Sequence, residues 1–214
     1  MINKLLFLSI TIFLFACGDS TTNSSKLPDR TPGIATVKGT IKNPNGKMIE
    51  LSSDGHASRV SIENGEFTIP ANLTEAGYYT LKNGRQSMVL FIAPGFDVTV
   101  NAAGRGFYQD LSLTGKGAKE NIFLRSRMNA AYELLPSRQN NYQLPENEFI
   151  GTIEDYRKAM TEKLDQYIVD NPELDEEFIA LEKLHINYDC AIEYFQYPQY
   201  NAVSYTHLTL PTKA

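Results

Sequence analysis

Apolar and polar side chains alternate in short runs over residues 34–115. Val37 and Ile41, for example, are separated by polar or small residues. Asn64-Gly65 and Asn83-Gly84 each lie between two such runs, and Asn43-Pro44-Asn45-Gly46 is a further predicted turn. An Asn-Gly pair in this position is typical of a two-residue β-hairpin turn, because both central residues of that turn need a positive φ. Several short strands at this spacing predict an antiparallel β-sandwich over residues 34–115.

The hydrophobic period changes to a helical one over residues 116–202, where apolar side chains recur every three or four positions. Three such stripes follow one another: Phe123 or Leu124, Met128, Ala131 and Leu135; then Phe149, Ile153, Tyr156, Met160, Leu164 and Tyr167; then Phe178, Leu181, Leu184 or His185, Tyr188, Ile192 and Phe195. Asn171 and Pro172 suit the N-cap and the first position of the third helix. Each stripe is narrow, so we expect a three-helix antiparallel region that packs together or against a partner. The predicted fold class is α+β, with the β-sandwich first and the helices after it.

The start of the chain has one apolar run, residues 5–15, with Lys4 before it and the small residue Ala16 after it. The run is about half the roughly 20 residues that a membrane-spanning helix needs. This layout is typical of a cleaved export signal. We therefore expect residues 1–16 to be a signal peptide. Residues 17–33 are rich in Ser, Thr, Asn, Asp and Pro, and we expect them to form a flexible tether.

The end of this signal, Leu14-Phe15-Ala16-Cys17, resembles the lipobox of bacterial lipoproteins. The resemblance implies cleavage between Ala16 and Cys17 and attachment of lipid to the Cys17 sulfur, because a thiolate is the nucleophile that the transfer needs. Acyl chains buried in a bilayer contribute about 0.8 kcal/mol per CH₂, so several chains hold a protein firmly. An ordinary signal peptide, with Cys17 as an incidental thiol, is the alternative.

The charge and the cysteine content of the chain limit where the protein can be located and which partners it can bind. The chain has 20 Lys and Arg against 25 Asp and Glu, a net charge of -5, which argues against a nucleic-acid partner. If Cys17 is lipidated, the only other cysteine, Cys190, has no disulfide partner. Asp19 lacks the acidic neighbours that mark surface export in some lipoproteins. We therefore expect a lipid-anchored protein of the cell envelope, on the periplasmic side rather than the cell surface.

The last residues, 203–214, break the helical pattern and contain no acidic side chain. They resemble translated sequencing-adapter read-through at the end of a metagenomic gene. We expect this tail not to be native, and the natural protein to continue beyond Ala202 with other residues.

The residue pattern predicts no catalytic, cofactor-binding or metal-binding site. His185 and Asp189 share a helix face, but Cys190 lies about 140° around the helix from His185, which argues against a Cys-His pair. We expect Cys190 to be a small buried residue. Gly115-Lys116-Gly117 joins a strand to a helix, where backbone amides can bind phosphate, but the Walker pattern is incomplete and a flexible helix entry is the simpler interpretation. His56 lies in a Ser/Asp/Gly turn and is expected to face solvent.

The order of these features resembles the N-terminal region of TlpA-like thiol-disulfide oxidoreductase lipoproteins. The features that carry the resemblance are the lipobox, the polar tether, the opening strand Val37-Lys38-Gly39-Thr40-Ile41, the hairpin over residues 60–69, the strand and turn over residues 88–95, and Leu113-Thr114-Gly115 before the helices. In that family a β-domain and a helical connector precede a C-terminal thioredoxin-like domain. The resemblance covers about residues 35–200. The Cys-x-x-Cys motif of the family is missing, so no position here matches a family active-site residue.

The resemblance implies a membrane-anchored periplasmic spacer that belongs to a thiol-disulfide oxidoreductase and lacks the redox site itself. On this interpretation the chain is not an enzyme, whereas its full-length parent is, and the partner in cis is a thioredoxin domain. The alternative is a complete lipoprotein that acts as a β-sandwich binding or scaffolding module at the cell envelope. Residues 39–70 also resemble the carboxypeptidase-regulatory type of β-sandwich, which favours that alternative. Neither interpretation requires a cofactor.

Overall fold

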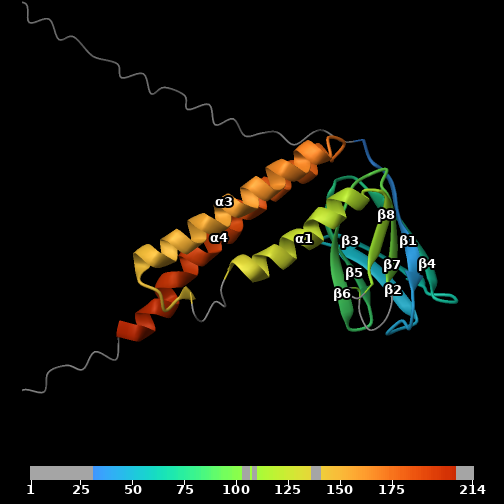
Figure 1. The fold of residues 1–214 in the computed structure, drawn as a ribbon. Helices are drawn as coiled ribbons and strands as arrows, with labels where there is room; N and C mark the ends of the chain where they lie inside the picture. Colours follow the sequence, from blue (N-terminus) through green and yellow to red (C-terminus); the bar gives the residue numbers. More distant parts are fainter. Residues whose placement is uncertain (1–30, 103–106, 108–109, 136–140, 206–214) are drawn as a thin grey trace, which may run out of the picture.

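The computed structural model describes residues 31–102, 107, 110–135 and 141–205, which form eight strands followed by three long helices (Figure 1). The elements are β1 (Gly33–Ile41), β2 (Met48–Ser53), β3 (His56–Ser61), β4 (Glu66–Leu73), β5 (Gly77–Asn83), β6 (Gln86–Ile92), β7 (Asp97–Ala102), β8 (Ser112–Lys116), α1 (Ala118–Leu134), α3 (Glu146–Asp170) and α4 (Glu176–Tyr205). The predicted α+β fold class, with a β-sandwich before the helices, is confirmed.

The strands form two four-stranded sheets with the orders β4-β1-β7-β8 and β3-β2-β5-β6. The strand pairs are antiparallel except for β1 and β7, which are parallel with Val37 beside Val98. Parallel neighbours need a long crossover connection. Here the crossover is β4 together with the whole second sheet. The sandwich is therefore mostly antiparallel, with one parallel pair that the alternation of side chains did not predict.

The sandwich core follows the predicted alternation, and one strand departs from it for a clear reason. β4 alternates buried and exposed residues along its whole length. β6 ends in Leu90, Phe91 and Ile92, which are all buried. The Phe91 ring lies 5.1 Å from the ring of Phe178 in α4. A strand that is covered on both faces loses its alternation, so this run marks the place where the helices cover the second sheet.

Asn64-Gly65 forms the predicted turn but not the predicted hairpin. Asn64 and Gly65 have φ values of 53° and 86°, as a type I′ turn requires. Glu63 and Glu66 exchange two backbone hydrogen bonds across it. Beyond this bridge the two strands separate, because β3 pairs with β2 whereas β4 pairs with β1 in the other sheet. The turn is a corner between the sheets.

At Asn83-Gly84 the turn is displaced by one residue from its predicted position. Asn83 pairs with Gln86, so Gly84 and Arg85 occupy the loop between β5 and β6. The Asn83 side chain is buried and accepts a hydrogen bond from the Asn45 backbone N–H at 2.7 Å. It also donates to two backbone carbonyls around the start of β2. Asn83 therefore holds the connection from β1 to β2.

The second predicted helical stripe is confirmed in α3, whose buried residues are Phe149, Ile153, Tyr156, Met160 and Leu164. The third stripe is only partly correct in α4: Phe178 is fully buried and Leu181 and Ile192 are partly buried. Its other members Leu184, Tyr188 and Phe195 are exposed by 65%, 62% and 73%. The face that α4 buries contains Glu182 and Glu193 as well as Ile186 and Cys190. A hydrophobicity pattern counts these acids as polar, which is why it placed the wrong face inward.

The predicted start of the third helix is also wrong. Asn171 is the C-cap of α3, and its backbone N–H donates to the Ile168 carbonyl. Asp175 caps α4 instead, because its Oδ1 accepts hydrogen bonds from the N–H groups of Glu177 and Phe178 at 3.0 and 3.2 Å. A carboxylate at this position satisfies free N–H groups and complements the helix dipole.

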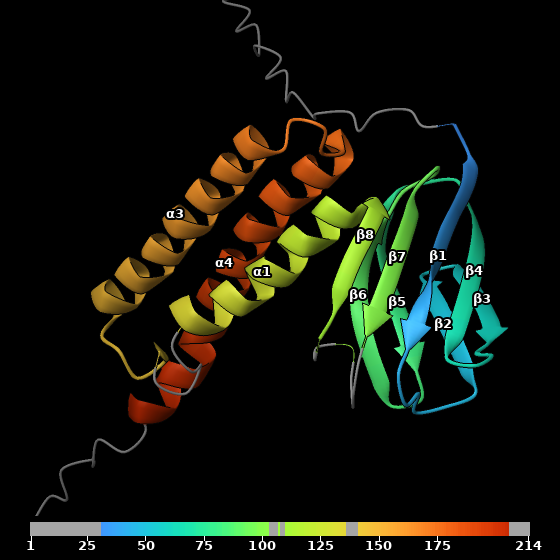
Figure 2. The same cartoon turned by 45° about the vertical axis from the view of Figure 1, so that its right-hand side comes forward.

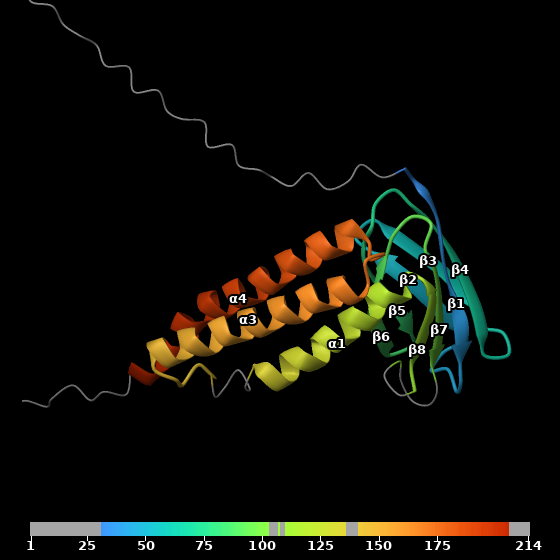
Figure 3. The same ribbon diagram turned by 45° about the horizontal axis from the view of Figure 1, so that its top comes forward.

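The three helices extend away from the sandwich as a helical arm (Figures 2 and 3). Asn121 of α1 fixes the arm to the edge strand β6: its Oδ1 accepts from the Phe91 N–H at 2.7 Å and its Nδ2 donates to the Phe91 carbonyl at 2.9 Å. The amide thus takes the place of a neighbouring strand at this edge. Among the described residues, no helix is both long and apolar enough to cross a membrane.

Candidate functional site

A polar cleft of about 460 Å³ lies at one end of the sandwich, between the β2–β3 turn and the β4–β5 connection. Its polar lining residues are Ser53, Asp54, His56, Asn72, Thr74, Glu75, Tyr78 and Tyr79. The His56 ring meets the Tyr79 ring edge to face, with centroids 5.9 Å apart, and His56 Nε2 lies 3.1 Å from the Ser58 hydroxyl. His56 was predicted to face solvent, but it is only partly exposed and forms part of this cleft.

The charges of the polar cleft decide which ligands it suits. Its charged lining residues are Asp54 and Glu75, and within the described part of the chain neither Lys nor Arg lines it. An anionic ligand would be repelled. Burial raises the pKa of Tyr79, a hydrogen bond from Ser53 opposes that rise, and Glu75 adds to it. The Tyr79 phenol therefore stays protonated and able to donate, which suits a neutral polyhydroxylated ligand or a cation.

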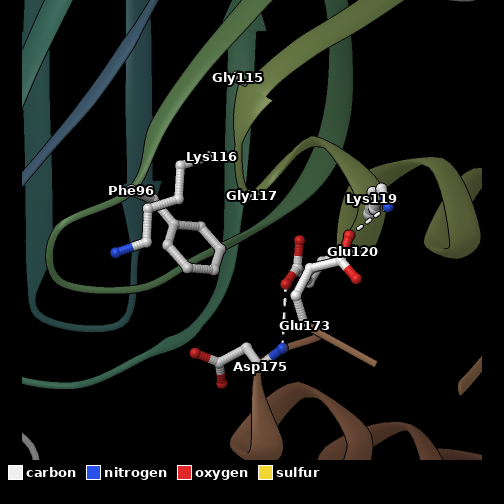
Figure 4. A pocket seen from close by; sticks show the side chains of 8 residues that line it. All are labelled: Phe96, Gly115, Lys116, Gly117, Lys119, Glu120, Glu173 and Asp175. Atoms are coloured by element: carbon white, nitrogen blue, oxygen red, sulfur yellow. Dashed lines mark hydrogen bonds and ion pairs between the residues drawn. The ribbon is translucent and has the colours of Figure 1, made fainter. Parts of the chain in front are cut away.

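A smaller junction pocket of about 220 Å³ lies where β8 enters α1 (Figure 4). Its lining includes Gly115-Lys116-Gly117, the segment considered above for phosphate binding. Gly117 caps α1 with φ of 97°, and a Cβ at this position would overlap the ring of Phe96. Gly117 is therefore required for close packing at a positive φ, which only glycine adopts without strain.

The lysine and carboxylate side chains of the junction pocket are largely engaged with its own groups (Figure 4). Lys119 forms an ion pair with Glu173, and that hydrogen bond lowers the pKa of Glu173. Glu120 Oε1 accepts a hydrogen bond from the Asp175 N–H at 3.0 Å. Three carboxylates and two lysines line the pocket, so it is a poor match for a phosphate group. Its contacts join the start of α1 to the start of α4.

A buried polar network ties the sandwich to the helical arm. Glu182 of α4 has no exposed side-chain surface; its Oε1 accepts a hydrogen bond from the Tyr78 hydroxyl of β5 at 2.6 Å. Its Oε2 lies 3.0 Å from Arg127 Nε of α1. Arg127 Nη1 donates to Asp189 Oδ2 at 3.2 Å, and the same oxygen accepts from the Tyr156 hydroxyl of α3 at 3.2 Å. We call these five residues the buried joint, because they connect β5, α1, α3 and α4.

The protonation states in the buried joint suit a structural role rather than a catalytic one. Burial, and then the charge and hydrogen bond of Glu182, raise the pKa of Tyr78. Burial, and then Asp189, raise the pKa of Tyr156 in the same way. Both phenols therefore remain protonated and donate to the carboxylates. One arginine lies against both carboxylates, so the joint has the composition of a fixed structural cluster.

The residues considered for nucleophilic chemistry are not brought together. Cys190 is fully buried, and its Sγ lies 4.0 Å from the Ile153 carbonyl oxygen. Burial raises the pKa of the Cys190 thiol, so the reactive thiolate is disfavoured. His185 packs edge to face against Tyr78 at 5.0 Å, whereas Asp189 is engaged in the buried joint. Cys190 is thus the small buried residue that was predicted.

The predicted processing and lipidation residues, Ala16 and Cys17, lie outside the described residues. So does the end of the predicted non-native tail, residues 206–214, whereas α4 continues to Tyr205. Across the part of the chain that the structure describes, no group of three or more His, Cys, Asp or Glu is placed to hold a metal ion.

Sequence reasoning missed the buried joint, although α4 carries a signal that could have revealed it. Glu182, Asp189 and Glu193 recur at intervals of seven and four, which places them on one helix face. Glu193 Oε2 accepts a hydrogen bond from the Tyr142 hydroxyl at 2.8 Å, so all three acids have tyrosine partners. A row of acids on one face of a helix that also contains apolar residues indicates either a solvated face or a buried polar seam.

No protein-family model, curated protein or solved structure matches the chain. A function for this chain is therefore argued from the residues and the geometry described above.

Proposed function

We propose that the chain is the membrane-anchored spacer of a cell-envelope thiol-disulfide oxidoreductase and that it carries no redox site of its own. The export signal, the lipobox ending in Cys17 and the resemblance to TlpA-like lipoproteins support this proposal. The structural observation that carries it is the buried joint. A spacer must keep a fixed distance and direction, and the joint fixes the helical arm on the sandwich through four elements.

The dimensions of the helical arm agree with a spacing role. α3 has 25 residues, which at 1.5 Å per residue corresponds to a length of about 37 Å. Within the described residues the one cysteine is Cys190, which is buried with a raised pKa. The chemistry of a reductase would therefore be supplied by another domain, with this chain setting its distance from the membrane.

The anchor is tested by feeding cells an alkynyl fatty acid and comparing three versions of the chain. We expect the label on the wild-type chain and on Cys190→Ala, which is the matched control because it removes the other thiol. Cys17→Ser should lose the label and remain an uncleaved, longer precursor. Undiminished labelling of Cys17→Ser would refute the lipobox assignment.

The redox parent is tested at the gene. Sequencing the genomic locus past the codon for Ala202 should reveal an in-frame thioredoxin-like domain with a Cys-x-x-Cys motif. The present chain should not catalyse the reduction of insulin disulfides, whereas the longer protein should. A native stop codon at that position would contradict the spacer proposal and leave the anchor proposal untouched.

A binding module at the cell envelope is the second candidate, and the polar cleft is the observation that favours it. Two probes of the matching chemistry are chitobiose, a neutral saccharide, and spermidine, a cation. Binding of either should shift the ring resonances of His56 and Tyr79, and Asp54→Asn with Glu75→Gln should weaken spermidine far more than chitobiose. Unchanged resonances at millimolar concentrations of both probes would count against a binding role for the cleft.

A further inference from the structure

The outward face of α4 is an apolar strip without charge. Leu184, Tyr188, Ala191 and Phe195 are all exposed and recur at intervals of four, three and four residues. At about 100° per residue they form one line along the helix. This strip lies opposite the face that α4 buries, and Figure 3 shows α4 along one edge of the helical arm.

The charges of α4 are arranged to leave this strip neutral. Between Phe178 and the end of the helix, the charged residues are Glu182, Lys183, Asp189 and Glu193. The three acids belong to the inward face, where Tyr78, Arg127, Tyr156 and Tyr142 contact them. Lys183 lies about 100° around the helix from Leu184. A helix that turns its acids inward and its aromatic residues outward has the opposite polarity to a solvated surface helix.

The strip is self-complementary under a two-fold axis. Leu184 and Phe195 are equally far from a point between Asp189 and Cys190, and so are Tyr188 and Ala191. If two copies pack antiparallel about that point, Leu184 of one faces Phe195 of the other. The large Tyr188 then faces the small Ala191, and no like charges meet. A two-fold interface requires such a match of a surface with itself.

We propose that the chain associates with a second copy of itself through this strip, with the two α4 helices antiparallel. This inference goes beyond the proposed function and does not depend on the lipid anchor. The exposed parts of the four side chains offer about 400 Å² per copy, since a fully buried Tyr or Phe contributes about 150–250 Å². The total of about 800 Å² is below the size of stable complexes, so the dimer is weak and depends on concentration.

Cysteine cross-linking in intact cells tests both the surface and its direction. Ala191 lies about 4.5 Å along the helix from its symmetry mate, so Ala191→Cys should join to itself with a short bis-maleimide. Leu184 lies about 16 Å along the helix from its own mate, so Leu184→Cys should not. Leu184→Cys co-expressed with Phe195→Cys should give the mixed dimer. Cross-linking of the wild-type chain measures the background that comes from Cys17 or the buried Cys190.

Val169→Cys is the matched control, because Val169 is apolar and 73% exposed but lies on α3. Adding Tyr188→Glu to Ala191→Cys should lower the cross-linked yield at least about tenfold, because the new carboxylate has no partner in an apolar contact. A yield for Ala191→Cys no higher than for Val169→Cys overturns the proposal. Self-linking of Leu184→Cys as strong as that of Ala191→Cys overturns the antiparallel arrangement. If Ala191→Cys gives only a product whose mass is not that of two copies, the partner at the strip is not a second copy of the chain.

Discussion

Removing Arg127 should break the connection between the sandwich and the helical arm. Arg127→Met keeps most of the aliphatic length of the side chain and deletes the charge. Glu182 would then keep a hydrogen bond from the neutral Tyr78 hydroxyl but lose its ion pair, in a position with no exposed side-chain surface. Asp189, which is partly exposed, would lose its hydrogen bond from the same arginine.

The size of the effect follows from burial. Deleting one partner of a buried ion pair costs about 3–5 kcal/mol of unfolding free energy, because the remaining charge is buried without compensation. The double variant Arg127→Met/Glu182→Leu removes that charge as well. It should recover about 2 kcal/mol relative to Arg127→Met alone, with the Tyr78 hydroxyl left unpaired accounting for part of the remaining loss.

Urea unfolding of the purified chain measures both variants. Far-UV circular dichroism follows the helices, and tyrosine fluorescence follows the whole chain, which contains no tryptophan. The two transitions should coincide in the wild type and separate in Arg127→Met, because the arm loses its hold on the sandwich. The control is Lys38→Met at the Lys38–Asp97 pair, which is 2.9 Å long with side chains 43% and 54% exposed and should cost about 1 kcal/mol or less. If Arg127→Met costs no more than Lys38→Met, the buried joint does not hold the two parts together.

Three further predictions concern titration, capping and close packing. The pKa of Tyr78 is raised in the folded state, so the stability it contributes is complete below about pH 10 and is lost as the pH rises beyond that value. Tyr78→Phe should flatten this alkaline decline in urea midpoints, and an unchanged decline in Tyr78→Phe would contradict the role given to Tyr78. Asp175→Ala should lower the unfolding free energy by about 1 kcal/mol through loss of the α4 cap; an unchanged urea midpoint would contradict the cap. Gly39→Ala should cost about 3 kcal/mol or more in thermal unfolding, because a Cβ there overlaps the Val100 carbonyl oxygen at φ of 151°. Gly151→Ala, on α3 with open space around it, should instead stabilise the chain by about 0.5–1 kcal/mol.

The local features of the sandwich could be predicted from the sequence, but its strand pairing could not. Alternation identifies the strands because one face of each meets the core, and Asn64-Gly65 forms its turn because of its own backbone preference. That preference acts over four residues, whereas the partners of β1 are β4 and β7. Turn chemistry therefore predicted a hairpin where the structure has a corner between sheets.

In the helices, too, contacts between distant residues could not be predicted from the local sequence pattern. α3 buries a row of apolar and aromatic residues from Phe149 to Leu164, so its periodicity identified the correct face. α4 buries Glu182 and Glu193, whose burial depends on tyrosine and arginine side chains from distant elements. A pattern within one helix cannot include those partners. The buried joint is therefore invisible to hydrophobicity alone, although the spacing of its acids is present in the sequence.

The parallel pairing of β1 with β7 has a consequence for the rate of folding. The hairpins β2–β3 and β5–β6 close over a few residues and can form early. β1 must wait for β7, with Val37 and Val98 brought together from distant parts of the chain. Contacts between distant residues slow folding, because the entropy of closing the loop is lost before the contacts form. Until then β1 has an unpaired edge of N–H and C=O groups, the kind of surface on which chaperones act and misassembly begins.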